Sequence, residues 1–271
     1  MREIWRTTSD LFWQHPVLWL PVLAADLVGF LLLTIRSRLL NWLAAQIMTH
    51  HSVLSDPGAG HGMSRSMAIS AGGVLFVITY FGLTLAYVLA LLLTAARTER
   101  LLRHDAKAHS PTAGPARWTM GGILRLSGLV FGSMLALEVL FLSPMSYALP
   151  LFHRSAWMHA KWLGWSTTLV AAALVAWMVA PAAIRFVARP SLSSPSDAGF
   201  AAGRALAVLA MAASLTVTGC WEVVGQSVFG GPILRWAFVF VGSEIGALPY
   251  VALFIAFGVI VHRGQSAPST L

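Results

Sequence analysis

The stretch from Trp236 to Val261 reads WAFVFVGSEIGALPYVALFIAFGVIV and carries one charged side chain, Glu244. A bilayer core of about 30 Å needs roughly 20 apolar residues in a helix, because a backbone in hydrocarbon must satisfy its own hydrogen bonds. The stretch is therefore predicted to cross a membrane as a helix. It lacks the period-2 alternation of a barrel strand, which excludes a membrane barrel.

Five similar apolar runs precede this stretch. They are Pro16 to Ile35, Met67 to Ala96, Gly122 to Tyr147, Leu163 to Val187 and Arg204 to Phe229. Only 10% of the 271 residues are charged and 57% are hydrophobic, whereas about 25% charged is usual in a soluble protein. We expect an all-α, polytopic membrane helical bundle with about six transmembrane helices, forming a single domain over residues 1–262, and a disordered tail over residues 263–271.

The basic residues predict the orientation of this bundle. Six helices place both termini on one side, and twelve of the 18 Lys and Arg residues fall on that side. Because cytoplasmic loops are enriched in basic residues, we expect both termini in the cytoplasm. The net charge of +8 is distributed as a topology signal, so the expected partners are the lipid bilayer and its anionic phospholipid headgroups rather than nucleic acid.

Two segments are predicted to lie along the membrane surface. Met1 to Gln14 mixes aromatic and charged residues as an interfacial helix does. In Leu39 to Met48, apolar side chains recur every four residues. A straight helix from Pro16 to Met48 would be about 50 Å long, too long for the bilayer, so we expect a bend near Arg36 to Arg38.

A cationic stripe extends the second span. Arg97, Arg100, Arg103 and Lys107 recur at steps of three, three and four residues, which places them on one face of a helix. We interpret the stripe as an anchor whose cations reach the headgroups. Specific binding of an anionic phospholipid and docking of a partner protein stay open.

Four acids inside the spans are the candidate functional residues: Asp26, Glu138, Glu222 and Glu244. Such groups are costly in hydrocarbon and indicate a function by default. At 1.5 Å per residue, Asp26 lies near mid-membrane and the other three lie in the outer half. No Lys or Arg occurs at comparable depth, so we expect hydroxyl, water, proton or cation partners. The candidate hydroxyl partners are Ser133, Thr216, Thr218 and Ser243.

Other motifs are less specific. Gly128-xxx-Gly132 and Gly242-xxx-Gly246 permit close approach of helices. His50, His51 and His61 gather in a predicted outer loop; their spacing matches no established metal frame, and we favour a solvated loop over a metal site. No H-E-x-x-H, G-x-S-x-G, P-loop or G-x-G-x-x-G motif occurs, so neither an enzyme nor a cofactor is expected.

The opening of the chain carries a resemblance. Residues 6–23 read RTTSDLFWQHPVLWLPVL, an amphipathic lead followed by His-Pro and Leu-Pro at the entry to the first span. Over residues 2–35 the chain resembles bacterial six-helix membrane proteins, including the membrane domain attached to some glycerophosphodiester phosphodiesterases. The resemblance implies a bacterial inner-membrane location and an all-helical fold. No phosphodiesterase domain is present, so it implies no catalytic residue.

Two functions remain open from the sequence. The first is a non-catalytic membrane component that binds lipid or supports a membrane partner protein. The second is a small transporter or permease subunit that uses the intramembrane acids for proton or cation coupling. The two differ in whether the acids line a water-accessible cavity.

Overall fold

The computed structural model describes residues 2–53, 61–105, 119–137, 157–188, 197–228 and 232–266. Within these ranges the chain is helical and contains no strand. The elements are α1 (Arg2–Gln14), the short 3-10 turn η1 (Pro16–Leu18), α2 (Leu20–Val53), α3 (His61–Asp105), α4 (Met120–Leu137), α6 (Trp157–Val187), α7 (Asp197–Val228) and α8 (Pro232–Ser266).

The expected all-α membrane bundle is confirmed. Five of the described helices, α2, α3, α6, α7 and α8, are long and apolar enough to cross a membrane, and α4 is a shorter apolar helix. These six helices contain the six predicted runs, apart from residues 16–19 of the first run, which precede α2 and include η1, and the ends of runs that fall outside the described residues. The fold is therefore that of an integral membrane protein.

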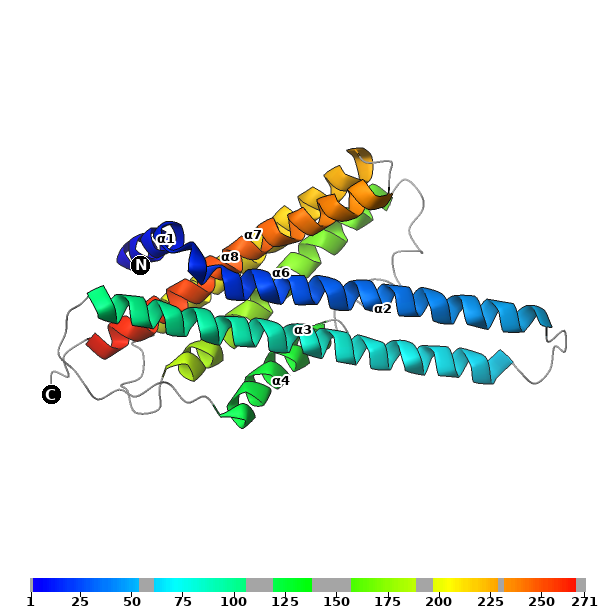
Figure 1. The fold of residues 1–271 in the computed structure, drawn as a ribbon, viewed down its shortest axis with the longest axis horizontal. Helices are drawn as coiled ribbons and strands as arrows, with labels where there is room; N and C mark the ends of the chain where they lie inside the picture. Colours follow the sequence, from blue (N-terminus) through cyan, green and yellow to red (C-terminus); the bar gives the residue numbers. More distant parts are fainter. Residues whose placement is uncertain are drawn as a thin grey trace.

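Helix α8 forms the centre of the bundle. It packs against α1, α2, α3, α6 and α7, and Figure 1 shows it (orange to red) running diagonally across the α2 and α3 pair. In its most apolar stretch of 18 residues, 67% is buried inside the protein, whereas the corresponding stretches of the other four long helices are 22 to 28% buried. Its residues from Leu253 to Val261 are buried without interruption. An apolar helix in a membrane can face either lipid or other helices, and this burial shows that other helices surround α8, so it organises the core.

Helices α2 and α3 form one long antiparallel pair (Figure 1). The predicted bend near Arg36 to Arg38, and with it a separate surface helix over Leu39 to Met48, is wrong, because α2 continues unbroken for 34 residues. Helix α2 contacts α3 at the position of the predicted bend. The Arg36 guanidinium lies 5.3 Å from the ring centres of both Phe76 and Tyr80, a cation–π geometry. In Figure 1 the far ends of α2 and α3 extend past the other helices.

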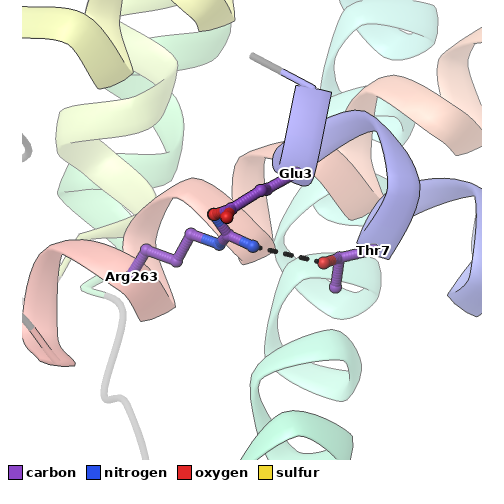
Figure 2. Close-up of polar contacts among 3 residues, drawn as sticks. All are labelled: Glu3, Thr7 and Arg263. Carbon is purple, nitrogen blue, oxygen red and sulfur yellow. Dashed lines mark hydrogen bonds and ion pairs between the residues drawn. The ribbon is translucent and has the colours of Figure 1, made fainter.

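Helix α1 is a separate helix, as predicted for Met1 to Gln14. Figure 2 shows its Glu3 and Thr7 facing Arg263 at the carboxyl end of α8. Arg263 forms an ion pair with Glu3 at 2.7 Å and donates a hydrogen bond to the Thr7 hydroxyl at 3.3 Å. Helix α8 continues to Ser266, so residues 263–266 of the predicted disordered tail are helical. The rest of the predicted tail, residues 267–271, lies outside the described residues.

Glycines bring α8 close to its neighbours. A Cβ added at Gly258 would lie 2.9 Å from the Thr98 Cβ and 3.2 Å from the Ala95 carbonyl oxygen, both on α3. In the predicted Gly242-xxx-Gly246 motif, a Cβ at either glycine would overlap a side chain of α7. The predicted Gly128-xxx-Gly132 motif of α4 makes no such contact, because a Cβ at either glycine would meet nothing within 4 Å. Close helix contact is thus confirmed for the α8 motif only.

We predict that Gly258→Ala destabilises the protein by about 1–3 kcal/mol relative to Gly128→Ala, because the added methyl group overpacks the contact with α3. Both variants gain the same helix propensity, about 1 kcal/mol, so their difference isolates the clash. Unfolding by sodium dodecyl sulfate in mixed micelles measures it. Equal stability of the two variants would mean that α3 and α8 do not pack tightly around Gly258.

Candidate functional site

The candidate site centres on the Asp26 carboxylate in α2. Helix α2 turns Asp26 towards α3 and α8, and the residue is only partly exposed. The Tyr87 hydroxyl of α3 donates a hydrogen bond to Asp26 Oδ1 at 2.8 Å. The Ser243 hydroxyl of α8 donates one to Oδ2 at 2.6 Å. Both carboxylate oxygens thus accept a hydrogen bond, each from a different helix.

These two contacts tie three helices together inside the apolar bundle. Hydrogen bonds between helices in a membrane contribute about 0.6 to 2 kcal/mol each. Their larger effect is to select one arrangement of the helices, because an unpaired carboxyl group in hydrocarbon is costly. Any other rotation of α2 or α8 would separate Asp26 from Ser243 and leave both polar groups without this partner.

The aromatic side of the site extends to α7. The ring of Tyr87 meets that of Tyr250 edge to face, with centroids 5.5 Å apart. The Tyr250 hydroxyl donates to the Met211 sulfur of α7 at 3.0 Å. Hydrogen bonds and this ring contact together therefore connect α2, α3, α8 and α7.

Glu244 lies beside this network. It follows Ser243 on α8, is partly exposed, and is close enough to Asp26 for the two charges to interact. Carboxyl groups within a membrane span are costly and need partners such as hydroxyl groups or water. Asp26 and Glu244 thus form an acid pair in which the oxygens of Asp26 are occupied by hydroxyl donors.

The structure brings together two of the four predicted acids, Asp26 and Glu244. Glu138 lies outside the described residues. Glu222 belongs to α7, but its side chain lies outside what the structure describes. The predicted position of Glu138 and Glu222 in the outer half of the membrane therefore stays a prediction.

Of the predicted hydroxyl partners, Ser243 is confirmed. Ser133 and Thr216 instead donate to carbonyl oxygens one turn earlier in their own helices, and Thr218 lies against Gly246. The partner that sequence reasoning missed is Tyr87. A tyrosine in an apolar run is typical of aromatic packing, and only the pairing of α2 with α3 places its hydroxyl on an acid.

The cationic stripe begins with a contact inside the protein. Arg97 Nη1 donates a hydrogen bond to the Val17 carbonyl oxygen of η1 at 3.2 Å, which ties α3 to the entry of α2. Arg100 is exposed. The Arg103 side chain and the whole of Lys107 lie outside what the structure describes. Binding of anionic lipid by this stripe stays a prediction.

The predicted loop position of the three histidines is wrong, because each belongs to a helix, and the metal hypothesis is untested. His50 and His51 belong to α2 and His61 begins α3, but their side chains lie outside the described part of the chain. Among the side chains that the structure does describe, no group of three or more His, Cys, Asp or Glu residues could hold a metal ion.

Fold and site together define the chain as an all-α integral membrane protein with an intramembrane polar network. The chain matches no protein-family model, no curated protein and no solved structure. The resemblance over residues 2–35 therefore stays a prediction.

We predict that Tyr87→Phe and Ser243→Ala each destabilise the bundle by about 0.6–2 kcal/mol, because each removes one interhelical hydrogen bond to Asp26. A double-mutant cycle with Asp26→Ala should show that the losses are not additive. Unfolding in mixed micelles provides the free energies. Thr216→Ala is the matched control, since its hydroxyl bonds only within α7 in this structure. Additive losses would contradict the Asp26 contacts.

Proposed function

We propose that the protein is a non-catalytic integral protein of a bacterial inner membrane that binds lipid or supports a membrane partner protein. The observation that carries this proposal is the state of Asp26, whose two oxygens accept hydrogen bonds from Tyr87 and Ser243. An acid whose two oxygens are both held by hydroxyl groups of other helices joins those helices and is not poised for chemistry. The absence of any catalytic signature in the sequence supports the same conclusion.

The outward faces of the bundle supply surfaces for lipid or for a partner. On the α2 and α3 pair, Trp42 is 59% exposed and Val74 is 57% exposed. On α4, the glycines at positions 128 and 132 leave open space beside the helix. Small residues on an apolar helix face permit close approach of another transmembrane helix.

The second candidate function is a small transporter or permease subunit. It is favoured by Glu244, which is partly exposed and interacts electrostatically with Asp26. An intramembrane acid beside a second carboxyl group can exchange a proton or bind a cation. In this case the Asp26 network would position Glu244, and Glu244 would carry the exchange.

For the orientation, we propose that both termini face the cytoplasm. The ion pair between Glu3 and Arg263 supports placing the two ends on the same side. The excess of Lys and Arg on that side of the predicted topology supports its assignment as cytoplasmic.

We predict that the protein in proteoliposomes carries no proton or sodium flux above that of protein-free vesicles. Asp26→Asn and Glu244→Gln should then leave the traces unchanged, as should the control Asp197→Asn, which removes an exposed acid at the start of α7. A pH-sensitive dye and a sodium-sensitive dye inside the vesicles measure the two fluxes. A flux that is lost in Glu244→Gln but kept in Asp197→Asn would reject the first function and support the second.

We also predict that alkaline phosphatase fused to either terminus is inactive in bacterial cells, whereas a fusion after Ser155, in a predicted outer loop, is active. The enzyme needs disulfides that form in the periplasm and not in the cytoplasm. Colour development on a chromogenic phosphate reports the activity. Active terminal fusions together with an inactive fusion at Ser155 would reverse the proposed orientation.

A further inference from the structure

Helix α1 presents two faces with different chemistry, and the inner face is fully engaged by the protein. Thr8 and Leu11 are buried, and the helix packs against α8. The ion pair of Glu3 with Arg263, seen in Figure 2, fixes its amino end. At its carboxyl end, the Trp19 indole donates to the Phe12 carbonyl oxygen at 2.9 Å. These contacts fix both the position and the rotation of α1.

The outer face combines tryptophan with arginine. Trp5 is 60% exposed and Trp13 is 71% exposed, and Arg2 and Arg6 are exposed as well. With 3.6 residues per turn, the four side chains fall within an arc of about 100°. Tryptophan prefers the boundary between lipid and water, and cations beside apolar rings are typical of helices that lie in that boundary.

The connection to α2 places this face at the membrane boundary. Directly after α1, Val17 is 59% exposed and Leu20 is 58% exposed, and α2 then continues as an apolar span. At the same level, Arg97 reaches the Val17 carbonyl oxygen. The hydrocarbon therefore begins within a few residues of Trp13, and the fixed rotation of α1 keeps its outer face at the level of the headgroups.

The charges on this face select the kind of lipid. Arg2 and Arg6 contribute two guanidinium groups, which bind phosphate oxygens in a bidentate manner. Of the acids on α1, Glu3 is paired with Arg263, and Asp10 lies at the edge of the outer face. A surface of net positive charge with two tryptophans between water and hydrocarbon matches an anionic phospholipid headgroup.

We propose that the face formed by Arg2, Trp5, Arg6 and Trp13 is a binding site for anionic phospholipid, held in the headgroup layer by the docking of α1 on α8. The proposal deepens the lipid-binding part of the proposed function and rests on it. It is distinct from the cationic stripe on α3, because it involves another helix and includes aromatic side chains.

The test places a fluorescent reporter on the face itself. Ser9→Cys in a Cys220→Ser background puts a single thiol between Trp5 and Trp13, where it takes a bimane label. The full-length protein is reconstituted in phosphatidylcholine vesicles that contain increasing fractions of either brominated phosphatidylglycerol or brominated phosphatidylcholine. Bromine quenches only a nearby fluorophore, so the fraction that gives half-maximal quenching measures the local preference for each lipid.

We expect brominated phosphatidylglycerol to quench at a much lower fraction than brominated phosphatidylcholine. Each arginine near an anionic surface contributes about fivefold in affinity, so Arg2→Gln with Arg6→Gln should remove most of the difference. Arg38→Gln, at an exposed position of α2, is the matched control and should leave it intact.

Three outcomes would overturn the proposal. Equal quenching by the two lipids would mean that the face does not select anionic headgroups. No quenching by either lipid would mean that water or a partner protein covers it, and an equal loss in Arg38→Gln would mean that overall charge decides. The flux measurement on Glu244→Gln is independent of all three, so failure here is distinguishable from failure of the proposed non-transport function.

Discussion

The rest of the structure depends on the pairing of the Asp26 carboxylate with hydroxyl groups of two other helices. Asp26 carries a polar carboxyl group in an apolar span, and in hydrocarbon such a group needs partners within the protein. Tyr87 and Ser243 supply them, one for each oxygen. Apolar helices can slide or rotate against each other at little cost, whereas these hydrogen bonds form in a single arrangement of α2, α3 and α8.

Helix α8 occupies the centre of that arrangement for reasons of shape as well as polarity. Gly258 lets it approach α3, and Gly242 and Gly246 let it approach α7. Because lipid tails are as apolar as leucine, close packing rather than a hydrophobic effect holds such helices together. The central helix therefore combines small residues at its contacts with a polar residue, Ser243, that fixes its rotation.

Structural and chemical roles separate within the polar network. Both acids are partly exposed, and both oxygens of Asp26 accept hydrogen bonds from other helices. The first acid therefore accounts for the assembly of the helices, and any exchange with water or ions would fall to the second. At its carboxyl end, Arg263 of α8 holds α1 in place, so the same helix contacts both Asp26 and α1.

The sequence by itself determined the all-α class, the membrane spans and the separate first helix, because hydropathy and backbone hydrogen bonding act locally along the chain. It also indicated Ser243 as a partner for an acid, and the close approach at Gly242 and Gly246. Only the tertiary structure decided that α2 continues unbroken, that α8 is central and that Tyr87 binds Asp26. All the spans share one helical period and similar apolar composition, so which helix faces which depends on contacts between residues far apart in the chain.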